Sequence, residues 1–177
     1  MNSAGPASLS PDSCEPRWYA AYTRSNHEKR VAAHLGLKSV QYFLPLYDSV
    51  RQWKDRRMRL ELPVFPSYVF VHVALRDRFQ VLQIPGVSKL VGFNGTPVPL
   101  AEKEIEILRK GWGSGVTVEP YPYLAIGRKV RIRSGPFAGV SGILLRRPKS
   151  LRVIISIELL KRSMAMDIDW RDLEPAG

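Results

Sequence analysis

The fold of the C-terminal part of this 177-residue chain is decided by the stretch Val130-Arg131-Ile132-Arg133-Ser134-Gly135-Pro136-Phe137-Ala138-Gly139-Val140-Ser141-Gly142. Apolar β-branched residues alternate with arginine at its start, which predicts a strand with one buried face. A Gly-Pro turn follows, and Gly135, Gly139 and Gly142 permit positive φ angles and close backbone approach in a tight corner. The Gly-Lys-Ser/Thr of a phosphate-binding loop is missing, so these glycines indicate a structural role.

Short strand patterns surround this stretch, at residues 129–133, 139–145, 152–157 and 164–168. Such a series predicts a small β-barrel, because a closed barrel leaves no strand edge unpaired. Upstream, glycine and proline without periodicity predict a linker. We therefore expect a leader at residues 1–16, a first domain at 17–112, a linker at 113–122 and a second domain at 123–177.

The first domain alternates between strand and helix patterns. A strand at residues 18–23 places Trp18, Ala20 and Tyr22 on one face. Ser25 and Glu28 have the spacing of a capping box, which predicts the start of a helix. Further strands are predicted at 67–73 and 87–93, and helices at 76–83 and 101–112. This mixture predicts an α+β domain.

The charge balance favours a polyanionic partner. The chain has 27 Lys and Arg against 16 Asp and Glu, a net charge of +11, and an isoelectric point near 10.1. Ten cations and three acids lie in residues 17–60, and eleven cations and five acids lie in 120–177. The chain has a single cysteine, Cys14, and no apolar run of membrane-spanning length, so we expect a cytoplasmic protein without a membrane partner.

The second domain resembles the KOW motif almost residue for residue. The first domain resembles the NusG N-terminal domain through residues whose order and spacing match: Trp18-Tyr19, Glu28-Lys29-Arg30-Val31, Phe65-Pro66-Ser67-Tyr68-Val69-Phe70-Val71 and Pro85-Gly86-Val87. The resemblance implies an N-terminal antiparallel sheet with flanking helices, followed by a small SH3-like β-barrel.

The resemblance also implies a function in transcription. The first domain of such proteins docks an aromatic pocket on the clamp helices of RNA polymerase and suppresses pausing or termination. By position, the polymerase-binding residues here are Tyr22, Phe65, Tyr68 and Phe70, although ordinary core positions are the alternative for each. The KOW domain of the family recruits a ribosomal protein or Rho, and the corresponding positions are Phe137, Ile157, Leu160 and Arg162.

The sequence departs from the housekeeping family member at two places, and the first departure points toward specialised paralogues. Ser67 stands where the housekeeping family member usually has glycine, which is similar to RfaH and the UpxY-type antiterminators. Residues 158–162 replace the usual Phe-Gly-Arg segment, which leaves open whether Rho or a ribosomal protein binds.

A basic helix face is the candidate nucleic-acid site. Arg24, His27, Arg30 and His34 are spaced to share one face, and they match positions where RfaH-like proteins contact the non-template DNA strand. Such a face can also bind nascent RNA, because it combines phosphate contacts with base stacking. A solvated helix face is the alternative. Arg56 and Arg57, in a basic hairpin tip, are a second candidate, and a solvated charged tip explains them equally well.

Nothing in the sequence indicates catalysis. There is no Cys-x-x-Cys and no His-Glu-x-x-His, and His27 and His34 lack a third ligand nearby, so we expect no enzyme activity, metal or cofactor. We expect a monomer. The competing interpretation is an RNA-binding or ribosome-associated KOW protein, and the large N-terminal domain argues against it.

Overall fold

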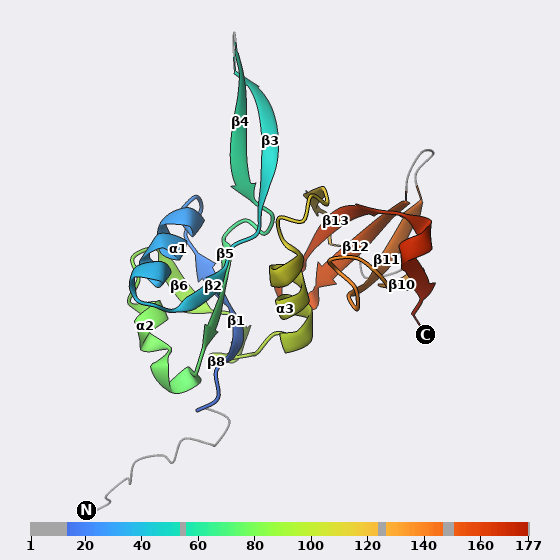
Figure 1. Cartoon of the computed structure of the whole chain (residues 1–177). Helices are drawn as coiled ribbons and strands as arrows, with labels where there is room; N and C mark the ends of the chain where they lie inside the picture. Colours follow the sequence, from blue (N-terminus) through green and yellow to red (C-terminus); the bar gives the residue numbers. More distant parts are fainter. Residues whose placement is uncertain (1–13, 54–55, 124–126, 147–150, 177) are drawn as a thin grey trace, which may run out of the picture.

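The computed structural model describes residues 14–53, 56–123, 127–146 and 151–176. Two parts lie side by side, an N-terminal α+β domain and a C-terminal β-rich domain, with helix α3 (Glu102–Gly111) between them (Figure 1). This arrangement confirms the predicted fold class.

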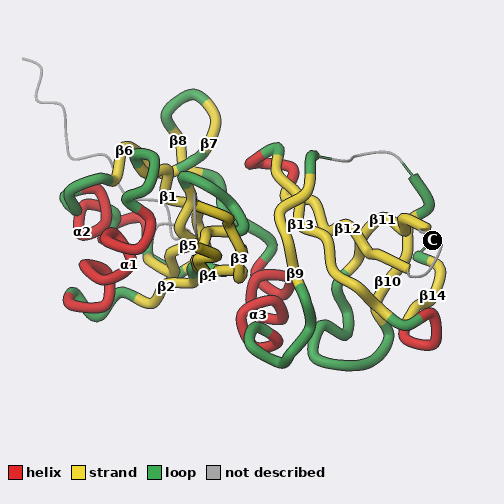
Figure 2. The backbone as a smooth tube through the Cα atoms, turned by 90° about the horizontal axis from the view of Figure 1, so that it is seen from above, coloured by secondary structure: helices red, strands yellow, loops and turns green. Residues whose placement is uncertain are grey.

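The N-terminal domain is built on a four-stranded antiparallel sheet with the order β2-β5-β1-β6. Its strands are β1 (Arg17–Thr23), β2 (Gln41–Phe43), β5 (Tyr68–Val73) and β6 (Val87–Leu90). Helices α1 (Glu28–Leu37) and α2 (Phe79–Leu82) lie on one face of the sheet, and α3 lies on the other (Figure 2). Val31 and Leu35 of α1 are buried against the sheet with Tyr19 and Val69, as the apolar spacing of the helix requires.

A two-stranded hairpin stands away from the body of the domain (Figure 1). Strands β3 (Leu46–Trp53) and β4 (Arg56–Pro63) pair antiparallel from Leu46↔Pro63 to Trp53↔Arg56. The two strands meet at the basic hairpin tip, of which residues 54 and 55 lie outside the described residues. A smaller hairpin joins β7 (Gly92–Phe93) to β8 (Thr96–Pro97).

The C-terminal domain is a six-stranded antiparallel sheet with the order β14-β10-β11-β12-β13-β9. Its strands are β9 (Val118–Tyr121), β10 (Lys129–Ile132), β11 (Ser141–Arg146), β12 (Leu151–Ile157), β13 (Arg162–Ile168) and β14 (Leu173–Pro175). Gly142 is required by close packing, because a Cβ atom there would lie 2.6 Å from the carbonyl oxygen of Ile154. Gly135 and Gly139 have φ angles of 86° and 94°, as the corner predicts.

Local details differ from the sequence expectations. The predicted capping box is wrong: His27 is the N-cap of α1, no side chain caps the helix, and Glu28 contacts another element. The helix predicted at 76–83 is divided into the 3-10 turn η2 (Leu75–Asp77) and α2. The predicted linker contains β9, which pairs with β13 and so lies within the second sheet.

Candidate functional site

The aromatic face of the N-terminal sheet lies on its α3 side. The antiparallel register pairs Trp18 with His72, Ala20 with Phe70 and Tyr22 with Tyr68. At the end of the sheet away from α3, Tyr22 remains 38% exposed, and its ring lies 5.5 Å from that of half-buried Tyr68. These two tyrosines form an aromatic pair that a partner could reach.

Phe65 and Phe70 are core residues in this arrangement. They are 1% and 0% exposed and pack edge to face with ring centroids 5.5 Å apart. The ring centroid of Phe43 lies 6.0 Å from that of Phe70 and 5.7 Å from that of Trp112. The aromatic contacts therefore run from the sheet to the end of α3. The structure therefore divides the four predicted polymerase-binding positions into an accessible pair and a buried pair.

A tight turn positions the two pairs relative to each other. Ser67 has a left-handed φ of 68°, and its N–H donates to the Glu28 carboxylate at 2.7 Å. The N–H of Tyr68 donates to the carbonyl of Phe65 at 3.1 Å. The first residue of α1 thus fixes the turn that connects Phe65 to Tyr68.

Helix α3 is fastened across the sheet by two carboxylates. The indole N–H of Trp18 donates to Glu106 at 2.9 Å, and Glu102 lies 3.2 Å from Nε2 of His72. A hydrogen bond from Arg109, together with the one from Trp18, lowers the pKa of Glu106 although burial opposes the shift.

The other side of α3 contacts the loop of residues 134–140 in the C-terminal domain. A Cβ atom at Gly111 would lie 2.6 Å from the carbonyl oxygen of Pro136 and 2.9 Å from the ring of Phe137. Ile107 lies one helical turn before Gly111 on α3, and a Cβ atom at Gly139 would lie 3.2 Å from its side chain. Glycine at position 111 therefore permits the closest approach of the two domains.

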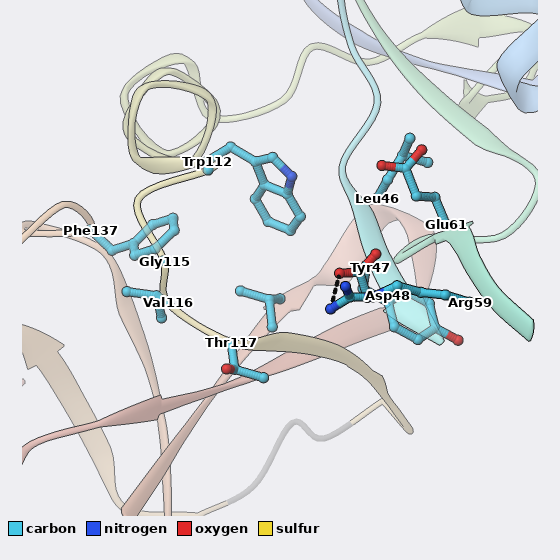
Figure 3. A pocket seen from close by; sticks show the side chains of 12 residues that line it. Leu46, Tyr47, Asp48, Arg59, Glu61, Trp112, Gly115, Val116, Thr117 and Phe137 are labelled. Carbon is cyan, nitrogen blue, oxygen red and sulfur yellow. Dashed lines mark ion pairs between the residues drawn. The ribbon is translucent and has the colours of Figure 1, made fainter. Parts of the chain in front are cut away.

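A cleft of about 490 Å³ lies beside this contact (Figure 3). The hairpin base supplies Leu46, Tyr47 and the ion pair of Asp48 with Arg59, whose charged atoms lie 3.1 Å apart. Trp112 and the following chain supply the opposite wall, with Phe137 at its edge. Because its walls belong to both domains, the cleft exists only while the domains stay together.

The positions expected to bind a KOW partner are spread between core and surface. Phe137 and Leu160 are buried, Ile157 is partly buried and Arg162 is exposed. Phe137 and Leu160 belong to the same continuous apolar cluster as Phe65 and Phe70. This shared cluster depends on how the domains pack, so the hydrophobic pattern of the sequence does not predict it.

The predicted nucleic-acid residues lie just before α1 and along it, from Arg24 to His34 in its last turn. Arg24 and Arg30 are exposed, and His27 and His34 are partly buried. Arg24 precedes the helix, and its N–H donates to the carbonyl of Gly86 at 2.8 Å. Helical periodicity keeps His27, Arg30 and His34 on one face.

The hairpin candidates are only partly described. Arg57 is exposed on β4, whereas the side chain of Arg56 lies outside the described part of the chain. Lys29 and Glu61 form an ion pair of 3.6 Å between α1 and β4, a link that sequence reasoning missed. The pair connects α1 with the hairpin.

Within the described ranges, no group of three or more His, Cys, Asp and Glu side chains could hold a metal ion. No helix among the described residues is long and apolar enough to span a membrane.

A family model described as "Transcription termination factor nusG" matches residues 16–109. Proteins described as "Transcription termination/antitermination protein NusG" from Escherichia coli (strain K12) and Staphylococcus epidermidis (strain ATCC 12228) are each 27% identical over 176 residues. These alignments cover 90% and 89% of this chain and 96% and 94% of the relatives.

A solved structure titled "Domain interaction in Thermotoga maritima NusG" is similar with a TM-score of 0.56 and 21% identity, covering 93% of this chain and 99% of that one. This likeness supports the fold. The sequence matches place the protein in the class of transcription termination and antitermination factors. Because the family model matches more than half of the chain, the chain belongs to the NusG family.

Proposed function

We propose that this chain binds the clamp helices of RNA polymerase through the sheet face that carries Tyr22 and Tyr68, and that it suppresses pausing or termination there. The observation that carries the proposal is the accessible tyrosine pair, with ring centroids 5.5 Å apart, on the sheet of a NusG-family domain. Exposed aromatic side chains make effective interface anchors, because they bury a large apolar area at little entropic cost. The factor acts as a monomer in the cytoplasm.

The C-terminal domain recruits a further partner, a ribosomal protein or Rho, through Phe137, Ile157, Leu160 and Arg162. Because the ring of Phe137 is 2% exposed and packs beside Gly111, a partner that needs this ring competes with helix α3. Recruitment through Phe137 therefore requires the contact between α3 and the 134–140 loop to open.

The basic face at α1 contacts the non-template DNA strand or nascent RNA. Exposed Arg24 and Arg30 support phosphate contacts, and the partly buried rings of His27 and His34 support stacking. The hairpin extends this surface, because the Lys29–Glu61 ion pair joins it to the helix. Arg56 and Arg57 provide further contacts.

Ser67 favours a specialised, operon-specific paralogue. Its φ of 68° lies in the left-handed region, which glycine adopts most readily. A serine at this position therefore has a less favourable backbone conformation than glycine would have. This departure matches the resemblance to RfaH and UpxY-type proteins.

The test replaces the accessible pair and leaves the core intact. We expect Tyr22→Ala with Tyr68→Ala to weaken binding to isolated clamp helices at least tenfold, since losing an aromatic anchor often costs about 2 kcal/mol or more. Tyr42→Ala is the matched control, because Tyr42 is also 38% exposed and pairs with Val71, on the opposite face of the sheet.

Equal affinity of the double variant and the Tyr42→Ala control would overturn the proposal. Co-purification of the wild-type chain with ribosomal particles alone, and without polymerase subunits, would favour the ribosome-associated alternative.

A further inference from the structure

Strand β10 of the C-terminal domain carries cations along the face that points away from the core. Val130 and Ile132 are buried, whereas Lys129 and Arg131 are exposed, and Arg133 continues the exposed series directly after the strand. Alternate residues of a strand point to the same side, roughly 6.6 Å apart. The three cations therefore form a stripe.

An exposed tryptophan lies at the end of this stripe. The 3-10 turn η4 (Trp170–Asp172) precedes β14, and the indole of Trp170 is 68% exposed. Arg133 fixes the turn, because its Nε donates to the carbonyl of Arg171 at 2.7 Å and its N–H donates to the carbonyl of Asp172 at 2.8 Å. The guanidinium of Arg171 lies 5.9 Å from the centre of the indole. We name Lys129, Arg131, Arg133, Trp170 and Arg171 the β10–η4 face.

Two of the acidic residues nearby are engaged in local hydrogen bonds. Asp169 accepts from the N–H of Arg171 at 3.0 Å, and Asp172 accepts from the hydroxyl of Ser134. Glu174 lies opposite Arg131 in the strand register and offsets one positive charge. Glu104 of α3 and Glu158 line the same hollow as Lys129 and Arg131 and offset part of their charge, although neither cation forms an ion pair within the described part of the chain.

The β10–η4 face also stays accessible while the two domains are in contact. Both views place β14 and its end of the C-terminal sheet far from the N-terminal sheet (Figures 1 and 2). The 134–140 loop contacts α3, and Glu104 of α3 borders the hollow that Lys129 and Arg131 line. A ligand that reaches Trp170 and Arg133 from the β14 side therefore needs no separation of the domains.

We propose that the β10–η4 face binds single-stranded nucleic acid. Lysine and arginine side chains contact successive phosphates, and Trp170 stacks on an unpaired base. A single strand fits better than a duplex, because only an unpaired base offers its face to an exposed indole. The stripe alone would also attract an acidic peptide, but the indole adds a contact specific to bases. This site is separate from the α1 face and does not depend on it.

The experiment measures binding of the full chain to short fluorescein-labelled oligouridine, oligothymidine and a DNA duplex by anisotropy over a range of salt concentrations. Each cation that contacts a single-strand phosphate adds roughly 0.7 to the slope of log affinity against log salt, so Arg131→Ala with Arg133→Ala should lower the slope by roughly 1.4. Trp170→Ala should weaken binding about fivefold or more at every salt concentration without changing the slope.

Two further variants separate this site from other sources of binding. Lys103→Ala with Lys110→Ala removes two exposed cations of α3 and should leave the slope unchanged. Arg24→Ala with Arg30→Ala tests the α1 face and should leave the effect of Trp170→Ala intact. Comparison of the three oligonucleotides distinguishes RNA from DNA as the source of the strand.

The proposal is overturned if the Arg131/Arg133 variant keeps the wild-type slope. It is also overturned if Trp170→Ala binds like the wild type, if the duplex binds as tightly as the single strands, or if a polyglutamate peptide competes equally well.

Discussion

Glu28 and Ser67 are the residues whose roles change most between sequence and structure. Glu28 has the spacing of a helix cap, but its carboxylate is buried and accepts from the N–H of Ser67. The residue therefore serves the Phe65–Tyr68 turn on the other side of the sheet. Spacing along one helix could not reveal this role, because the partner is 39 residues away.

We expect Glu28→Ala to destabilise the protein by about 1–3 kcal/mol, because the N–H of Ser67 loses its charged acceptor. Ser67→Gly should change the free energy of unfolding by less than about 1 kcal/mol, because two effects oppose each other. Glycine removes the backbone strain of a serine at positive φ, which stabilises the folded state, but it also increases the conformational entropy of the unfolded chain. Urea unfolding of both variants is the measurement. A larger loss for Ser67→Gly than for Glu28→Ala would contradict this account.

The aromatic residues show what residue type alone can predict. The motif identifies Tyr22, Phe65, Tyr68 and Phe70 by position, and the register confirms that Tyr68 and Phe70 share a face. Exposure depends on α3 and Trp112, which come from distant parts of the chain, so the burial of Phe70 was not predictable. Phe70→Ala would destabilise the fold by about 3–5 kcal/mol, so a loss of polymerase binding in this variant would report on stability and not on a direct contact.

Among the elements, α3 depends on Glu106 for its attachment to the sheet. The lowered pKa of Glu106 means that its ionised form is stabilised by folding. Its contribution is therefore fully present above the ordinary carboxyl pKa of 4.5 and is lost as the pH falls through the lower, folded-state value. We expect Glu106→Gln to reduce the difference in stability between pH 7 and pH 3, as measured by thermal unfolding. An unchanged pH profile would contradict the role of this carboxylate.

Gly111 controls the contact between α3 and the C-terminal domain. Gly111→Ala should separate the domains, because its Cβ atom would lie within 3 Å of Pro136 and Phe137. Small-angle X-ray scattering should then give a larger radius of gyration, with each domain still folded. Lys110→Ala, an exposed change one residue away, should leave the radius unchanged. If both variants scatter like the wild type, Gly111 does not limit the approach of the domains.

The α1 face gives a prediction that separates phosphate contacts from a solvated surface. Arg24→Ala with Arg30→Ala should lower the salt slope for elongation complexes with an exposed non-template strand by roughly 1.4, and leave binding to free clamp helices intact. His34→Ala should weaken binding at every salt concentration without altering the slope, if its ring stacks on a base. A wild-type slope in the double arginine variant would mean that this face is merely solvated.

Elements with a local signal were predictable, and those that depend on distant partners were not. The strands β1, β5 and β10 follow from alternation and β-branched residues, and α1 follows from its apolar spacing. Strand β9 was missed because glycine and proline surround it and because it is defined by pairing with β13, far along the chain. The hydrophobic pattern cannot report such pairing.

At the scale of the whole molecule, positive charge is concentrated around α1 with the hairpin and again in the C-terminal domain. Residues 61–119, which hold six cations and six acids, include α3, the helix that contacts both domains. Composition predicted a polyanionic partner, and the fold places the two basic regions on different surfaces. Such a distribution suits a factor that holds a protein partner with one face and nucleic acid with others.

The central claim is that the Tyr22–Tyr68 face couples this chain to transcribing RNA polymerase. The direct measurement is a synchronised elongation assay with purified polymerase of the same organism on a template with a defined pause. The wild-type chain and the Tyr42→Ala control should shorten the pause, whereas Tyr22→Ala with Tyr68→Ala should leave its duration as it is without any factor. A double variant that shortens the pause as well as the wild type would contradict the account.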